Sequence, residues 1–129
     1  MTERPCRGVL VVEDDAGIRE SIIQVLDDNE FASTGAENGA VALERLRASQ
    51  GAHPCLILLD MMMPIMDGKR FRLSQQDDPA LAGIPVVVLT AHPSGERTAR
   101  DLDVAGFLKK PVDLQDLLNV VQRYCEPNP

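Results

Sequence analysis

The sequence lacks an excess of positive charge. Across its 129 residues, 13 lysines and arginines stand against 20 aspartates and glutamates, which gives a formal net charge of −7. A protein that binds nucleic acid directly needs a basic surface for the phosphate backbone, and the sequence shows no such stripe. We therefore expect no nucleic acid among its partners.

The sequence also lacks a long apolar run. Every apolar stretch is much shorter than the roughly 20 residues that cross a bilayer as a helix, and the first residues contain no apolar core of a signal peptide. We therefore expect a cytoplasmic protein with no membrane partner.

Paired cysteines are missing as well. Cys6, Cys55 and Cys125 are widely spaced, and no CxxC motif suggests a zinc site or a redox dithiol. We expect three reduced thiols. Cys55 begins an apolar run, so we expect it to be a small core residue.

The length and composition are those of one globular domain. The chain is 44% hydrophobic and 26% charged, without internal repeats or low-complexity segments. We expect a single domain over residues 1–129, with a core at about 7–124 and short polar tails at both ends. Only a short segment follows Tyr124 in the sequence, so we expect either a single-domain protein or a domain cut from a larger protein.

Short apolar runs alternate with segments of helical period. Runs without polar interruption are typical of parallel strands that are buried on both faces. Three runs are clear and two are weaker, and in chain order the five segments are 9–12, 31–35, 55–59, 86–89 and 107–109.

Apolar residues at helical spacing lie between these segments. Ile18, Ile22, Val25 and Leu26 follow the i, i+4, i+7, i+8 pattern of a helix packed on a sheet. Further helices are expected around 42–46, after Gly68, between 94 and 104, and at 114–121. Strand and helix thus alternate, which predicts an α/β fold with a doubly wound, five-stranded parallel sheet and five helices. Such sheets bind ligands beyond the carboxyl ends of their strands.

Polar residues follow the predicted strands. Glu13 and Asp14 come after the first strand, Asp60 after the third, Thr90 after the fourth and Lys110 after the fifth. Converging carboxylates repel one another unless a cation lies between them, and hard oxygen ligands suit Mg²⁺. The pattern therefore predicts a magnesium site with a lysine beside it.

Each residue also has a simpler explanation. An acidic residue after a strand often caps the next helix, and Asp15 is the expected N-cap here. Asp60 could be a turn residue, Thr90 a satisfied strand-end hydroxyl and Lys110 a solvated surface lysine. The functional interpretation is favoured because all of them fall at the same ends of separate strands.

The segment 58–68, LLDMMMPIMDG, closely resembles the phosphorylation loop of response-regulator receiver domains. In that family an Asp ends the third strand, Met-Pro follows three and four residues later, and Met-Asp-Gly comes next. The matching residues are Asp60, Met63, Pro64, Met66, Asp67 and Gly68.

Other segments carry the same resemblance, which covers nearly the whole chain. The acidic segment 11–15 is similar to the family's acidic pair, and Arg19 is the arginine usually found five residues beyond the metal-binding Asp. The segments 89–91 (LTA) and 110–111 (KP) complete the set. The resemblance implies a flavodoxin-like receiver domain of a two-component phosphorelay.

The resemblance implies a function for Asp60. It would accept a phosphoryl group from the phosphohistidine of a histidine kinase or phosphotransfer protein, or from a small acyl phosphate. Asp14, Asp60 and the backbone carbonyl of Met62 would bind Mg²⁺ directly, and Glu13 would act through water. The chain would catalyse its own phosphorylation and would not be a turnover enzyme.

The resemblance also implies a switch. Lys110 would offset charge on the phosphoryl oxygens, Thr90 would hydrogen-bond one of them, and Phe107 would move with Thr90 and change a surface that a downstream protein recognises. Phe107 has no hydroxyl group, and an ordinary core phenylalanine is the alternative.

Two other functions are alternatives to this interpretation. A flavodoxin-like cofactor-binding protein would share the fold, but no glycine-rich phosphate loop follows the first strand. A pseudo-receiver that serves only as a scaffold is disfavoured, because all the required side chains are present.

The chain departs from the family between Thr90 and Phe107, where it is shorter. The segment starts with 92–95 (HPSG), which delays helix formation, and Asp103 replaces the glycine that commonly ends this helix. We therefore expect the fourth helix to be short or displaced.

Overall fold

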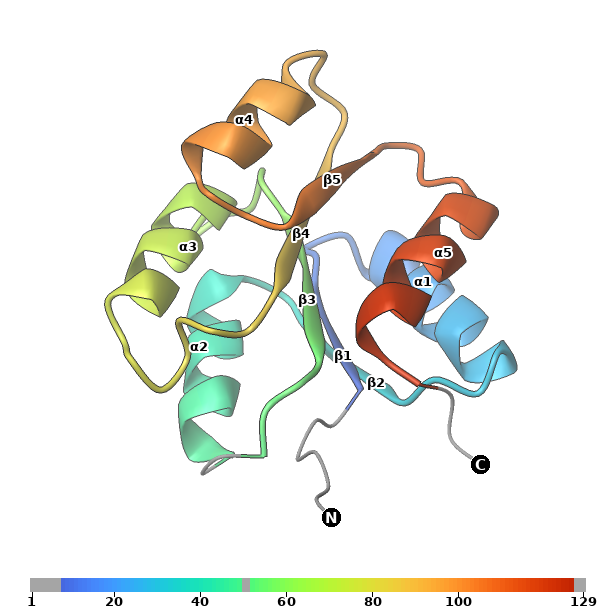
Figure 1. Cartoon of the computed structure of the whole chain (residues 1–129), viewed down its shortest axis with the longest axis horizontal. Helices are drawn as coiled ribbons and strands as arrows, with labels where there is room; N and C mark the ends of the chain where they lie inside the picture. Colours follow the sequence, from blue (N-terminus) through green and yellow to red (C-terminus); the bar gives the residue numbers. More distant parts are fainter. Residues whose placement is uncertain (1–7, 50–51, 127–129) are drawn as a thin grey trace.

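The computed structural model describes residues 8–49 and 52–126. These residues form a five-stranded parallel sheet with the strand order β2-β1-β3-β4-β5 (Figure 1). The strands are β1 Val9–Val12, β2 Ser33–Ala36, β3 Leu56–Asp60, β4 Val86–Thr90 and β5 Gly106–Lys109. The predicted α/β fold is confirmed.

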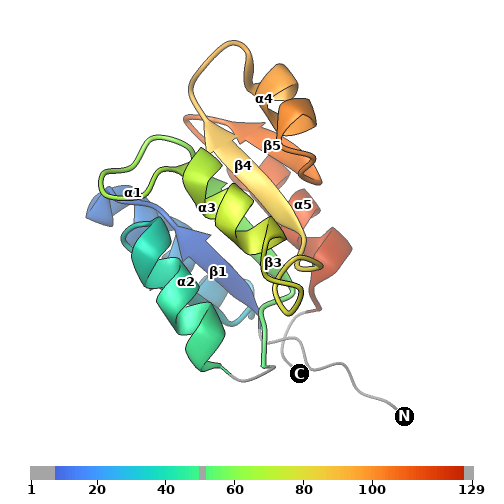
Figure 2. The same ribbon diagram turned by 90° about the vertical axis from the view of Figure 1, so that its left-hand side faces the viewer.

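Five helices alternate with the strands. They are α1 Ala16–Asp28, α2 Gly39–Ala48, α3 Gly68–Gln76, α4 Gly95–Asp101 and α5 Leu114–Tyr124. Helices α1 and α5 cover one face of the sheet, whereas α2 and α3 cover the other, with α4 beside the β5 edge (Figures 1 and 2). Right-handed crossovers place a helix on one face or the other according to the direction in which the next strand is added, and in the order β2-β1-β3-β4-β5 that direction reverses once.

The core lies on both faces of the three central strands. In β3, Leu56, Ile57, Leu58 and Leu59 are completely buried, and Asp60 is 3% exposed. Burial of each such side chain contributes about 1.5–3 kcal/mol. One cluster joins the sheet to α1 and α5 and the other joins it to α2 and α3, which explains the unbroken apolar runs.

Four helices begin with a side-chain cap. Asp15, Asn38, Asp67 and Asp113 each accept a hydrogen bond from the backbone N–H three residues later. Such a cap contributes about 1 kcal/mol, so the predicted N-cap at Asp15 is confirmed. At α4, the side chain of Ser94 makes no capping hydrogen bond within the described residues.

The strand boundaries differ from the predicted ones. The second strand begins at Ser33, because Phe31 packs in the core before the strand starts. Strands β3 and β4 extend to Asp60 and Thr90, which still take part in parallel pairing with β4 and β5. The two polar residues are therefore held by the sheet and do not lie in the following loops.

Two residues at predicted apolar helix positions are exposed. Ile18 in α1 and Leu114 in α5 have exposed fractions of 38% and 56%. Both lie in the first turn of their helix, whereas Ile22 and Leu117 farther along are buried. The apolar spacing predicted the helices correctly, but not where each helix extends beyond the core.

The prediction that all three cysteines are reduced thiols is wrong for Cys55. Cys55 is buried, as expected, but it is disulfide-bonded. Cys125 is also buried, and its Sγ lies 3.9 Å from the carbonyl oxygen of Gly8. Cys6 lies outside the described residues. The wide spacing of the cysteines left no sequence motif that could reveal this disulfide.

The prediction of a short fourth helix is confirmed. Helix α4 contains seven residues, about two turns. Asp103, which stands where the family commonly has glycine, adopts a φ of 54°. The backbone therefore keeps the left-handed conformation that ends such a helix, although the glycine is absent.

Within the part of the chain that the structure describes, no helix is both long enough and apolar enough to span a bilayer.

Strain in the loop after β3 leads to a first prediction. Ile65 has a φ of 68°, is 77% exposed, and lies in a tight turn closed by a 2.7 Å hydrogen bond from Met66 N to Pro64 O. A β-branched residue is strained in this conformation, and its exposed side chain contributes little burial in return. Ile65→Gly should raise the free energy of unfolding by about 1 kcal/mol, measured by urea denaturation.

The matched control is Ile65→Val, which keeps the β-branched side chain and should leave the stability unchanged. A loss of stability in Ile65→Gly would show that the side chain contributes more to the fold than its exposure indicates.

Candidate functional site

The polar strand-end residues meet at one edge of the sheet. Strands β1 and β3 are neighbours with Val12 opposite Leu59, so the residues after β1 lie beside the end of β3. Asp60 pairs with Leu89, and Thr90 pairs with Lys109. The register thus brings the candidate residues of four strands to the same carboxyl edge.

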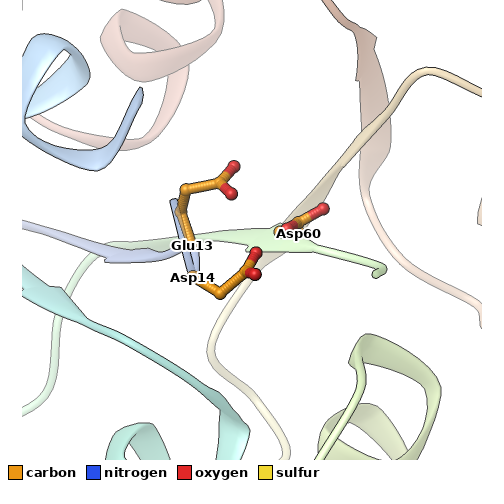
Figure 3. A group of neighbouring side chains, drawn as sticks. All are labelled: Glu13, Asp14 and Asp60. Carbon is orange, nitrogen blue, oxygen red and sulfur yellow. The ribbon is translucent and has the colours of Figure 1, made fainter. Parts of the chain in front are cut away.

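Three carboxylates form a cluster at this edge. Glu13, Asp14 and Asp60 each offer an oxygen, and these oxygens lie within 4.8 Å of one another (Figure 3). Glu13 and Asp60 are buried, whereas Asp14 is exposed. A set of closely spaced carboxylate oxygens with one side open to solvent suits a hard divalent cation such as Mg²⁺.

Lys110 provides the positive charge that accompanies this cluster. Its Nζ lies 2.8 Å from Glu13 Oε1 and 3.2 Å from Asp60 Oδ1. Burial alone would lower the pKa of Lys110, but the hydrogen bonds and charges of Glu13 and Asp60 outweigh burial and raise it. The backbone N–H of Lys110 donates to Thr90 O at 2.9 Å, and a cis peptide bond joins Lys110 to Pro111.

Asp60 has a strongly altered acidity. Burial, followed by hydrogen bonding and charge repulsion from Glu13, raises the pKa of Asp60 to about 7. The backbone N–H of Met62, 3.2 Å from Asp60 Oδ1, and the charge of Lys110 act in the opposite direction. Asp60 therefore binds a proton near neutral pH unless a cation in the cluster favours the ionised form.

Thr90 and Phe107 lie together against the start of α4. A Cβ placed on Gly95 would be 2.7 Å from Thr90 Cγ2 and 3.1 Å from Phe107 Cδ2. Thr90 is buried, and Phe107 is 38% exposed. A side chain at position 95 would clash with both residues, so glycine allows the first turn of α4 to pack directly against Thr90 and Phe107.

In the sequence, Gly95 is recognisable only as a residue that delays helix formation. Its contact with Thr90 and Phe107 depends on how β4, β5 and α4 pack, so no local pattern indicates it. His92 is exposed, and its Nδ1 accepts a hydrogen bond from Ser94 N at 3.1 Å. The imidazole thus contacts its own loop.

Two further residues position the cluster. Arg19 Nη1 donates to the backbone carbonyl of Glu13 at 2.8 Å, which fixes the turn between β1 and α1. A Cβ on Gly68 would lie 2.8 Å from the carbonyl oxygen of Asp60, so α3 begins in direct contact with the end of β3. Both residues belong to the family motifs, but their contacts follow only from the folded arrangement.

Comparison with known proteins agrees with this arrangement. The sequence profile of the family described as response regulator receiver domain matches residues 9–122. The phosphate regulon transcriptional regulatory protein PhoB of Escherichia coli is 36% identical over 126 residues, covering 94% of this chain and 54% of PhoB. The response regulator MprA of Mycobacterium ulcerans is 36% identical over 115 residues, covering 85% of this chain and 46% of MprA. The chain thus spans about half the length of these curated relatives.

Solved structures show the same fold. The chemotaxis response regulator CheY4 of Vibrio cholerae superposes with a TM-score of 0.80 at 28% identity, over 93% of this chain and 99% of CheY4. A CheY-like receiver domain protein of Methanospirillum hungatei gives a TM-score of 0.78 at 30% identity, over 90% of this chain and 91% of that protein. With nearly the whole described chain matched and the strand-end carboxylates, threonine and lysine gathered at one edge, the protein belongs to the response regulator receiver domain family of two-component signalling.

Proposed function

We propose that Asp60 accepts a phosphoryl group from the phosphohistidine of a histidine kinase or phosphotransfer protein, with the help of one Mg²⁺. The observation that supports this most directly is the position of Asp60, whose carboxylate lies in a cluster with two other carboxylates and 3.2 Å from Lys110 Nζ. A nucleophile between a cation site and a fixed ammonium group suits phosphoryl transfer, in which the main demand is charge stabilisation.

The proposed metal ligands are oxygen atoms at the carboxyl edge. They are the carboxylates of Asp14 and Asp60, the backbone carbonyl of Met62, and Glu13 through water. The cluster fits the ion because its oxygens lie within 4.8 Å of one another and Asp14 is open to solvent. When bound, Mg²⁺ would supply positive charge to the phosphoryl oxygens.

In the proposed reaction, a carboxylate oxygen of Asp60 forms a bond to phosphorus while the bond from phosphorus to the imidazole nitrogen of the donor breaks. The donor imidazole is the leaving group, and Asp60 becomes an acyl phosphate. Only the ionised carboxylate is a nucleophile, so the proton that Asp60 holds near neutral pH must leave first. Lys110 would then lie beside both the acceptor and the transferred group.

The proposed output begins at Thr90. In the structure, Thr90 Oγ1 accepts a hydrogen bond from His92 N at 3.0 Å. After phosphorylation, the hydroxyl of Thr90 would instead move to donate a hydrogen bond to a phosphoryl oxygen. Because Gly95 fits tightly between Thr90 and Phe107, this movement would shift the first turn of α4 and the ring of Phe107. A downstream protein would recognise the changed surface.

The domain organisation and the cellular location of the protein are part of the proposed function. We propose that residues 1–129 contain one receiver domain with its core at about 7–124, and that it acts in the cytoplasm without binding nucleic acid or membrane. It modifies itself and does not turn over a free substrate. Disulfides such as that of Cys55 are more typical of oxidising compartments than of the cytoplasm. A reduced Cys55 would therefore agree with the proposed cytoplasmic location, and an oxidised one would argue against it.

The first test is phosphorylation by acetyl phosphate in the presence of Mg²⁺, followed by intact-mass spectrometry. The wild-type protein should gain one phosphoryl group, and Asp60→Asn should gain none, because an amide is not a comparable nucleophile. The matched control is Asp113→Asn, at the N-cap of α5, where asparagine caps equally well. Full labelling of Asp60→Asn would contradict the assignment of Asp60 as the acceptor, and a wild-type protein that gains no phosphoryl group would favour the pseudo-receiver alternative.

The second test concerns the pH dependence of Mg²⁺ binding. Because the pKa of Asp60 is raised to about 7, the ion must displace a proton below that pH. The dissociation constant for Mg²⁺ should fall about tenfold from about pH 6 to about pH 8, measured by calorimetry. Asp60→Asn should bind weakly with no such dependence, and an unchanged constant in the wild type would argue that Asp60 is not a ligand.

The third test concerns stability without metal. The folded protein holds the Asp60 proton up to about pH 7, whereas an ordinary carboxyl loses it near 3.8. The protonated carboxyl of Asp60 therefore makes its full contribution to stability below about pH 3.8. This contribution is lost as the pH rises through about 7. Relative to wild type, Asp60→Asn should gain on the order of 2 kcal/mol in the free energy of unfolding between about pH 5 and about pH 8. A constant difference across this range would contradict the raised pKa.

A further inference from the structure

Helix α3 buries two polar side chains that the proposed reaction does not use. Arg72 is 7% exposed and Gln75 is completely buried. The buried face of a surface helix normally carries apolar residues, and a buried cation needs partners that replace water. These two residues therefore call for an explanation beyond ordinary packing.

Three nitrogens of Arg72 donate hydrogen bonds. Nε donates to Leu102 O at 3.0 Å, Nη2 donates to Asp103 O at 2.6 Å, and Nη1 donates to Gln75 Oε1 at 2.7 Å. Leu102 and Asp103 are the residues at which α4 ends. A guanidinium group at this position satisfies terminal carbonyls and complements the negative end of the helix dipole.

Gln75 fixes the other side of this arrangement. Its Nε2 donates to Leu81 O at 2.9 Å and to Ile84 O at 3.0 Å, in the segment that leads into β4. The amide of Gln75 therefore cannot turn away from Arg72 without leaving buried carbonyls unpaired. We call these two residues the Arg72–Gln75 pair.

The two ends of α4 are held differently. Its last residues are bonded to Arg72, whereas its first turn has no side-chain cap from Ser94 and packs through Gly95 against Thr90 and Phe107. Moving the last residues would leave a buried cation and several carbonyls without partners, which is costly. Moving the first turn breaks no cap. The end that contacts Thr90 is thus the one that can move.

Helix α3 also begins at the proposed phosphorylation site. The backbone N–H of Gly68 donates to Met61 O at 3.2 Å, and a Cβ on Gly68 would lie 2.8 Å from the carbonyl oxygen of Asp60. Helix α3 therefore connects the end of β3 to the end of α4.

We propose that the Arg72–Gln75 pair fixes the end of α4 to α3, so that α4 responds to phosphorylation only in its first turn. The inference rests on the proposed phosphorylation of Asp60, and it specifies how that event changes the surface. Helix α4 pivots about Leu102 and Asp103, and the surface that a downstream protein recognises is limited to the β4–α4 loop, the first turn of α4 and Phe107.

The test is amide hydrogen exchange of the full chain with Mg²⁺ alone and with Mg²⁺ plus beryllofluoride, a stable mimic of the phosphoryl group. In the wild type, exchange should change in residues 91–98. It should stay the same at Leu102, Asp103 and Val104, whose N–H groups donate to the carbonyls of Thr98, Arg100 and Ala99.

The informative variant is Arg72→Lys, which keeps the charge but cannot donate to both carbonyls in one plane. Without beryllofluoride, exchange at residues 102–104 should become about tenfold faster. With beryllofluoride, the change should extend from the first turn of α4 through these residues. The matched control is Arg70→Lys on the exposed face of α3, which should behave as wild type.

Two results would overturn the inference alone: a wild-type response to beryllofluoride that reaches residues 102–104, or wild-type exchange at these residues in Arg72→Lys. The wild-type measurement decides the first point even if the variant does not fold. If beryllofluoride changed exchange nowhere, including at Met61 and Met62, the proposed function would fail together with the inference.

Discussion

The contact of Lys110 with Glu13 and Asp60 is the interaction on which the site depends. Two buried carboxylates beside each other would repel strongly, and the ammonium group 2.8 Å from one and 3.2 Å from the other offsets that repulsion. The compensation is incomplete, because burial and Glu13 still raise the pKa of Asp60 to about 7. The site therefore remains short of positive charge, and this is the electrostatic reason for it to bind a divalent cation.

The sheet makes this arrangement possible. The apolar residues of β1, β3 and β4 are buried on both faces, so the polar residue after each run can lie only where the strand ends. In a parallel sheet all these ends share one edge, and the order β2-β1-β3-β4-β5 places β3 at the centre. Asp60 consequently has β1 with its acidic residues on one side and β4 with Thr90 on the other.

The second polar arrangement lies on the other side of the same fold. The side chain of Arg72 donates hydrogen bonds to the backbone carbonyls at the end of α4, and the side chain of Gln75 donates to carbonyls in the segment before β4. Helix α4 has only seven residues, so its own hydrogen bonds and burial contribute little, and its position depends on neighbouring elements. A short helix that is anchored at one end and contacts Thr90 and Phe107 at the other is suited to a switch.

Much of this protein was determined by local sequence. Unbroken apolar runs and helical spacing predicted the α/β fold, Asp15 was predicted to cap α1, and the order of Glu13, Asp14, Asp60 and Lys110 predicted where charge would gather. Tertiary structure alone decided the disulfide at Cys55, the tight fit of Gly95 between Thr90 and Phe107, and the bonds from Arg72 to the end of α4. Periodicity and capping arise from neighbours within a few residues, so sequence records them. Contacts between separate helices, strands and loops depend on how these elements pack, which no local pattern encodes.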